Sequence, residues 1–180
     1  MNAMNTHYPD PTLVEPVTRH TLAVVVDNEP GVLARISGLF SGRGYNIESL
    51  TVSETEHEKH LSRITIVTTG TNAILEQIKN QLQRLVPVHR VVDLTVQGNA
   101  IERELALVKV AGKGESRVEA MRLASAFGAR TVDATLSSFV FELTGTTEEV
   151  ERFINLMVVV GLVEVSRTGV AAMARGAEAM

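Results

Sequence analysis

The residues best suited to chemistry lie in one turn, Asn28-Glu29-Pro30-Gly31, between an apolar run and an amphipathic stretch. Pro30 fixes its own φ and suits the first position of a helix, and Gly31 lets a backbone or a ligand come close because it has no Cβ. A turn at a helix N-terminus offers free N–H groups and the positive end of the helix dipole, which suits a carboxylate. The alternative is an ordinary strand–helix turn in which Pro30 and Gly31 serve geometry alone.

No other cluster indicates a self-contained active site. His57 and His60 lie three apart among glutamates, but charges at a hairpin tip more often keep the loop hydrated than hold a metal. Gly42-x-Gly44 and Gly112-x-Gly114 each lack the third glycine of a dinucleotide fingerprint. The sequence has no Walker motif, no cysteine and no base–nucleophile pair at a diagnostic spacing. We therefore predict no catalytic residue, no metal site and no cofactor on this chain.

Composition narrows the class of protein and its compartment. The chain has 180 residues, of which 44% are hydrophobic and 21% charged, enough for one domain or two small ones. Its net charge of −4 leaves no basic field for a polyanion, so nucleic acid is a poor partner. No apolar run approaches the roughly 18 residues of a membrane span, and no secretory signal is present. We expect a cytoplasmic protein, without a membrane partner.

Apolar periodicity places the turn inside a strand–helix–strand–strand–helix–strand unit. The helix begins just after Gly31 and ends at Gly42, and a second helix lies between Thr71 and Pro87. Neither face of the strand at 47–54 is fully apolar, which is typical of an edge strand. The expected strands are 21–26, 47–54, 61–69 and 88–96. This order is the split βαβ, ferredoxin-like pattern.

The same pattern repeats after a polar joint at 97–101. The expected elements are strands at 104–110, 130–133, 138–143 and 162–166 and two helices with capping boxes at Ser116/Glu119 and Thr146/Glu149. The predicted fold is α+β, two tandem ferredoxin-like (βαββαβ) domains. We place a disordered leader at 1–18, the first domain at 19–97, the second at 102–167 and a tail at 168–180. RNA-recognition domains share this fold but need exposed aromatics on the central strands, and strands 21–26 and 61–69 have none.

Four segments carry a resemblance to a known family: NEPGVLARISGLFSGRGYNIESLTVSETE, LSRITIV, LEQIKNQL and ERELALVKV. They resemble the small regulatory subunits of acetolactate (acetohydroxyacid) synthase, over about residues 19–176. The first half is similar to an ACT domain, the amino-acid-sensing version of the ferredoxin-like fold, and the RGYNIESL run at 43–50 is the most specific part.

The resemblance implies a non-catalytic partner in valine, isoleucine and leucine biosynthesis. Such a subunit binds the large catalytic subunit, raises its activity and confers feedback inhibition by a branched-chain amino acid, with valine as the leading candidate. Thiamine diphosphate, magnesium and FAD would be bound by the catalytic subunit. The alternative is a free-standing ACT-domain amino-acid sensor or transcriptional regulator, against which stands the lack of a helix-turn-helix or basic segment.

In the family, two ACT domains pair side by side and the effector lies at their interface, so the resemblance implies a homodimer. It places Asn28, Gly31 and Leu33 of one chain opposite Asn46 of the facing chain. The effector's carboxylate would meet N–H groups near Gly31 and Val32. Its ammonium would donate to the side-chain oxygens of Asn28 and Asn46 or to a nearby carbonyl. Its side chain would bury against Leu33 for roughly 1.5–3 kcal/mol. Lesser candidates are Pro30, Val32, Ile47, Thr51 and Val52.

The second half lacks an Asn-x-Pro-Gly sequence at its equivalent turn, 112–115. We therefore expect no second effector site of this kind and assign that half to dimerisation or interdomain packing. The sequence leaves open which branched-chain amino acid binds and which surface meets the catalytic subunit.

Overall fold

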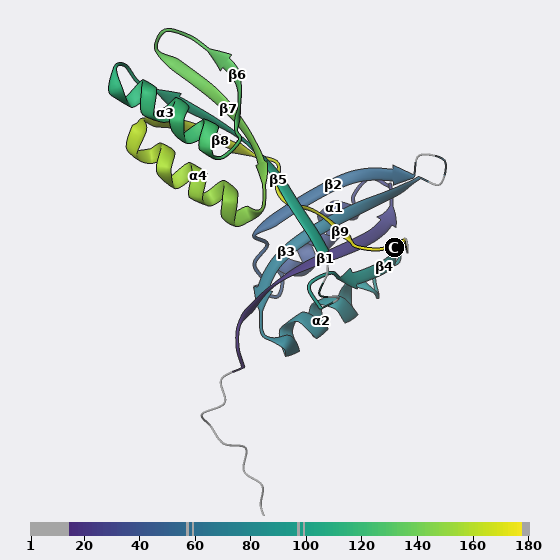
Figure 1. The fold of residues 1–180 in the computed structure, drawn as a ribbon. Helices are drawn as coiled ribbons and strands as arrows, with labels where there is room; N and C mark the ends of the chain where they lie inside the picture. The colour runs from purple at the N-terminus through teal and green to yellow at the C-terminus, as the bar shows by residue number, and fades with distance from the viewer. Residues whose placement is uncertain (1–14, 57, 59, 97, 99, 178–180) are drawn as a thin grey trace, which may run out of the picture.

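The computed structural model describes residues 15–177 except 57, 59, 97 and 99. It contains two βαββαβ units, which confirms the predicted fold class (Figure 1). Most of the predicted leader, residues 1–14, lies outside the described residues, and the first strand begins at Thr18, the last residue of that predicted leader. None of the helices described is long and apolar enough to cross a membrane.

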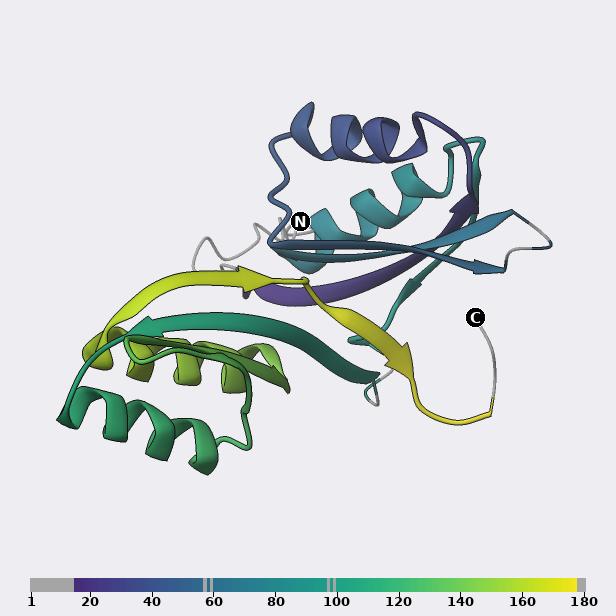
Figure 2. The ribbon, with the colours of Figure 1, turned by 90° about the horizontal axis from the view of Figure 1, so that it is seen from above.

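The first unit is a four-stranded antiparallel sheet with two helices on one face (Figure 2). Its elements are β1 (Thr18–Asp27), α1 (Val32–Ser41), β2 (Ser49–Glu56), β3 (Leu61–Gly70), α2 (Asn72–Leu82) and β4 (Val88–Asp93). The strand order is β2-β3-β1-β4, so β2 lies at an edge, as predicted. The core includes Leu22, Val24, Val26, Ile36, Phe40, Ile64, Ile66, Leu75, Ile78 and Leu82.

One boundary of this unit differs from the prediction. The strand expected to reach residue 96 ends at Asp93. The Oδ1 atom of Asp93 accepts hydrogen bonds from the backbone N–H groups of Thr95, at 3.0 Å, and Val96, at 3.4 Å. These two N–H groups are therefore bonded to a side chain and not to a neighbouring strand. A side-chain acceptor of this kind favours a turn, which ends the strand.

The second unit repeats the arrangement with strand order β6-β7-β5-β8. Its elements are β5 (Ala100–Ala111), α3 (Glu115–Ala126), β6 (Arg130–Ala134), β7 (Ser138–Gly145), α4 (Thr147–Val160), β8 (Leu162–Arg167) and β9 (Ala171–Ala174). The capping box of α4 is confirmed: Thr146 Oγ1 accepts from Glu149 N at 3.3 Å, and Glu149 Oε2 accepts from Thr146 N at 2.8 Å. Its core includes Val108, Val110, Phe139, Phe141, Leu143, Val150, Phe153 and Met157.

The capping box predicted at Ser116 and Glu119 is wrong. Gly114 is the N-cap of α3, with φ 58° and no side-chain cap, so the helix begins at Glu115 and Ser116 lies inside its first turn. The Glu119 carboxylate instead accepts two hydrogen bonds from Arg122, at 2.9 and 2.8 Å. Gly114 can adopt the positive φ that leads the chain into the helix. The N-cap therefore lies two residues earlier than the predicted N-cap, Ser116.

The predicted tail at 168–180 contains a strand, which corrects that boundary. Strand β9 pairs antiparallel with the first part of β5, from Ala100 opposite Ala174 to Arg103 opposite Ala171. We call these paired residues, 100–103 and 171–174, the β5–β9 ribbon. The second unit therefore begins at about residue 100 rather than 102, and its last strand lies beyond 167.

The ribbon covers the face of the first sheet that carries no helices (Figure 2). Val170, just before β9, and Ala172 are 2% and 8% exposed. They form a third core with residues of the first unit: Ala23, Val67 and Leu94. The small residues of β9 give only a weak strand pattern in the sequence. Burial of Val170 and Ala172 against the first unit stabilises this segment.

Candidate functional site

The turn before α1 presents backbone donors without side-chain competition. Gly31 is the N-cap residue, with φ 89° and ψ −8°, and no side chain caps the helix. The N–H groups of Leu33 and Ala34 have no acceptor among the residues that the structure describes. The first turn of α1 also contains no acidic side chain. The positive end of the helix dipole is therefore open to an external anion.

Backbone hydrogen bonds hold this turn against the sheet. Asn28 N donates to His60 O at 2.7 Å, and Asp27 N donates to Pro87 O at 2.9 Å. The Asn28 side chain is exposed and has no partner in the described part of the chain. Val32 is 4% exposed and belongs to the first core, so only its backbone can face a ligand. Leu33, by contrast, is 42% exposed.

Asn46 lies in the loop that leads into β2, at the other end of the sheet. Its carbonyl accepts a hydrogen bond from Thr68 Oγ1 at 2.6 Å, and its side chain is exposed. Asn28 lies level with His60, the residue just before β3, whereas Asn46 lies level with Thr68 on β3. Eight residues of extended strand separate these levels, roughly 25 Å. Within one chain, therefore, the structure does not bring Asn28 and Asn46 together.

The remaining predicted residues divide between the two faces of the first sheet. Val52, opposite Ile64, lies on the helix side and is 46% exposed, and Ile47 packs partly against the same core. Thr51 lies on the other face, toward the second unit. A Cβ built at Gly169 would come within 2.9 Å of Thr51 Oγ1. The structure thus places Thr51 away from the other candidates, because side chains alternate along a strand.

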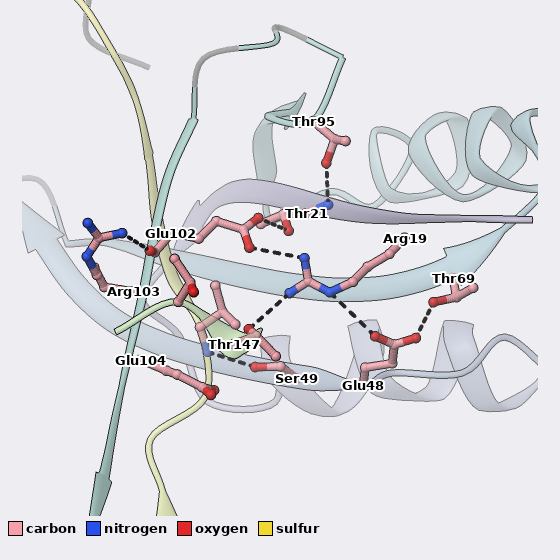
Figure 3. A network of polar contacts seen from close by, with 12 residues as sticks. Arg19, Thr21, Glu48, Ser49, Thr69, Thr95, Glu102, Arg103, Glu104 and Thr147 are labelled. Atoms are coloured by element: carbon pink, nitrogen blue, oxygen red, sulfur yellow. Dashed lines mark hydrogen bonds and ion pairs between the residues drawn. The ribbon is translucent and has the colours of Figure 1, made fainter. Parts of the chain in front are cut away.

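Sequence reasoning missed a polar cluster between the two units (Figure 3). Arg19 on β1 contacts Glu48, just before β2, and Glu102 on β5, and its Nη2 donates to Thr147 Oγ1 at 3.5 Å. The only signal in the sequence is that Glu48 belongs to the RGYNIESL run. Its partners come from distant positions, which no local pattern connects.

A cavity of about 400 Å³ opens beside this cluster, lined among others by Arg19, Glu48, Glu104, Thr147 and Arg167. The Glu104 side chain is 2% exposed and accepts a hydrogen bond from Arg167. No group of three or more His, Cys, Asp or Glu side chains in the described ranges could hold a metal ion.

Comparison with known proteins identifies the family. Residues 103–176 match the family model described as the small subunit of acetolactate synthase, and residues 22–90 match an acetohydroxyacid synthase small-subunit-like ACT domain. A probable acetolactate synthase small subunit of Archaeoglobus fulgidus is 47% identical, over 88% of this chain and 98% of the relative. The isozyme 3 small subunit of Escherichia coli is 44% identical, over 90% of this chain and 99% of the relative.

A solved structure agrees with these matches. The acetolactate synthase small subunit from Thermotoga maritima superposes with a TM-score of 0.80 at 36% identity, over 89% of this chain and 99% of that chain. Both halves are covered by family models, and the relatives match along nearly their whole length. The chain therefore belongs to the family of acetolactate synthase small subunits, and its first half is an ACT domain.

Proposed function

We propose that this chain activates the large catalytic subunit of acetolactate synthase and makes that subunit sensitive to feedback inhibition by a branched-chain amino acid, valine first among them. Family membership supports a large-subunit partner, and the ACT domain supports an amino-acid effector. Thiamine diphosphate, magnesium and FAD are assigned to the catalytic subunit, and the complex to the cytoplasm. This chain contributes regulation, without catalytic residues of its own.

The observation that carries the proposal is the placement of the candidate residues at opposite ends of an exposed edge strand. β2 starts near Asn46 and ends level with Leu61, beside the turn at Asn28 and Gly31. If two β2 strands pair antiparallel across a two-fold axis, the Asn46 end of one chain meets the Gly31 end of the other. Such a homodimer forms two equal sites, each complete only with both chains.

The chemistry at each site suits a small apolar amino acid. Its carboxylate accepts from the free N–H groups at the start of α1, and its ammonium donates to the Asn28 and Asn46 side-chain oxygens. Its side chain covers Leu33 and Val52, which lie exposed on the helix side of the sheet. The effector favours an arrangement of the dimer that activates the catalytic subunit less. It shifts that balance only by its differential affinity, typically about 1–3 kcal/mol.

Calorimetric titration of the purified chain with valine, leucine and isoleucine tests the site. We expect saturable binding of at least one, weakened about 10- to 100-fold in Asn46→Ala, since a hydrogen bond to a charged group contributes about 1.5–3 kcal/mol. Asn80→Ala, an exposed asparagine on α2, is the matched control and should bind as the wild type does. Equal affinity in both variants would remove Asn46 from the site.

A second variant separates inhibition from activation. A Cβ at Gly31 meets nothing within 4 Å, so an Asp side chain has room, and its carboxylate places a negative charge at the start of α1, where the effector's carboxylate would bind. Because Gly31 has φ 89°, the substitution strains the backbone, and circular dichroism must first show that the variant folds. Reconstituted with the catalytic subunit, this variant should activate normally and resist inhibition. If Gly31→Asp remains as inhibitable as the wild type, the site assignment is wrong. Failure to co-purify with a thiamine-diphosphate enzyme would instead favour a free-standing sensor.

A further inference from the structure

The reverse face of β2 holds the second unit. Ser49 Oγ accepts a hydrogen bond from Val170 N at 2.8 Å. Gly169, with φ 83°, lies so close that an added Cβ would stand 2.8 Å from Ser49 Oγ and 2.9 Å from Thr51 Oγ1. The connection between β8 and β9 therefore rests directly on the strand that begins beside Asn46.

One arginine reinforces this attachment from the first unit (Figure 3). Arg19 lies 3.7 Å from the Glu48 carboxylate, and its Nη1 donates to Glu102 Oε2 at 3.0 Å. It also reaches Thr147 at the start of α4, and Thr21 donates to the other oxygen of Glu102. We call Arg19, Glu48, Glu102 and Thr147 the latch. It ties the segment before β2 to two elements of the second unit.

The latch stands next to open space rather than to a packed core. Cavities of about 400 Å³ and about 620 Å³ are both lined by Arg19, Glu48 and Thr147. In the described part of the chain, the buried apolar cluster that joins the two units is small and consists of Ala23, Val67, Leu94, Val170 and Ala172. Few buried contacts and nearby space are the conditions under which one unit shifts against another at low cost.

From this placement we propose that the latch couples the effector site to the position of the second unit. Glu48 lies two residues from Asn46, and Ser49 three, so one short segment carries a proposed effector contact and two of the attachments to the second unit. The inference rests on the proposed effector site and specifies its regulation. The second unit is then part of the amino-acid response although it holds no effector itself.

Whether the latch raises or lowers effector affinity depends on how it affects the order of segment 46–49. With the latch intact, segment 46–49 is already held in place when the effector arrives. Without the latch, the effector must order that segment itself, so its affinity falls. Coupling between two sites is reciprocal, so effector binding must in turn steady the Thr168–Ala174 region of the second unit.

Two variants in the second unit test the coupling without touching the effector residues. Glu102→Ala removes the acceptor of Arg19 and Thr21, and Gly169→Ala wedges the β8–β9 connection away from Ser49. The matched control is Glu164→Ala, which breaks a carboxylate–lysine pair with Lys109 inside the second unit alone. Circular dichroism checks folding, and if Gly169→Ala folds poorly, Glu102→Ala alone decides.

The readouts are valine titration and amide hydrogen exchange on the full chain. We expect valine affinity about fivefold or more lower in Glu102→Ala and Gly169→Ala and unchanged in Glu164→Ala. In the wild type, valine should slow exchange at 168–174 as well as at 28–33 and 46–49. The proposal is overturned if exchange slows only at the effector segments and Glu102→Ala binds within twofold of the wild type.

The wild-type titration distinguishes this failure from a failure of the proposed function. If the wild type binds no branched-chain amino acid, the effector site itself is wrong, and the coupling falls with it. If the wild type binds, but exchange slows only at the effector segments and Glu102→Ala binds within twofold of the wild type, only the coupling is wrong.

Discussion

Replacing Val170 by alanine should destabilise the folded chain although the residue lies in the stretch that the sequence suggests is a tail. Val170 is 2% exposed and packs in the core that joins the two units. Its neighbours there include Ala23 and Ala172, whose side chains are too short to fill the vacated space. The cavity should therefore persist, which is the costly case for a large-to-small change.

The magnitude follows from the atoms removed. Two methyl groups leave an apolar site, at about 0.8 kcal/mol each. A residual cavity of roughly 40 Å³ adds about 1 kcal/mol, at about 24 cal/mol per Å³. We expect Val170→Ala to lower the free energy of unfolding by about 2.5 kcal/mol. With a urea m-value of about 2 kcal/mol/M, the midpoint should fall by about 1 M.

Urea unfolding followed by circular dichroism measures this, at one fixed protein concentration because the proposed dimerisation would contribute to apparent stability. Met173→Ala is the control: Met173 lies on β9 itself and is 64% exposed, so its truncation should change the free energy of unfolding by less than about 0.5 kcal/mol. If Val170→Ala proves as mild as Met173→Ala, the third core does not hold the units together, and residues 168–180 behave as a tail.

Three further outcomes test local features. Thr146→Ala should cost about 1 kcal/mol of unfolding free energy in urea titration, whereas Ser116→Ala should cost almost nothing, because only the first caps a helix. Backbone and side-chain hydrogen bonds from Thr146 lower the pKa of Glu149, so the stability advantage of wild type over Glu149→Gln should be full at neutral pH. Urea midpoints measured at successively lower pH should show that this stability advantage disappears as the pH falls through the lowered pKa of Glu149. Gly161→Ala should lower the thermal midpoint by several degrees or more, since φ is 110° and a Cβ would collide with the Ala111 carbonyl oxygen.

Local patterns were sufficient to predict most elements because their causes are local. The spacing of apolar residues in α1 reflects one face buried against one core. Ile64 and Ile66 on β3 share one face of the strand and pack in that same core. β9 was missed for the opposite reason. Its sequence, AAMA, is too short and too small to show a strand, and its burial depends on a sheet about a hundred residues earlier in the chain.

In the candidate site, too, features with local causes could be predicted, and features that depend on distant parts of the chain could not. The turn at Gly31 and the edge character of β2 are readable from Pro, Gly and the mixed faces of the strand. Which face a residue joins depends on what covers each side of the sheet. Thr51 and Val52 are both among the lesser candidates, although alternation sends them to opposite faces of the sheet. The latch could not be predicted from local patterns, because the contact between Arg19 and Glu102 depends on how the two units pack together.

A comparison of the two halves explains why one fold serves two purposes in this chain. α1 and α3 occupy equivalent positions, yet the first turn of α1 has no acidic residue, whereas α3 begins with Glu115. That carboxylate satisfies the helix dipole and repels an amino acid's carboxylate, so the second half offers no equivalent anion site. The turn backbones differ as well: Gly31 has φ 89° and ψ −8°, whereas Gly114 has φ 58° and ψ −130°. The second half instead supplies the ribbon that covers the first sheet. The asymmetry supports the proposal that ligand binding belongs to the first unit, and that the second unit provides the surface through which a response of the first is transmitted.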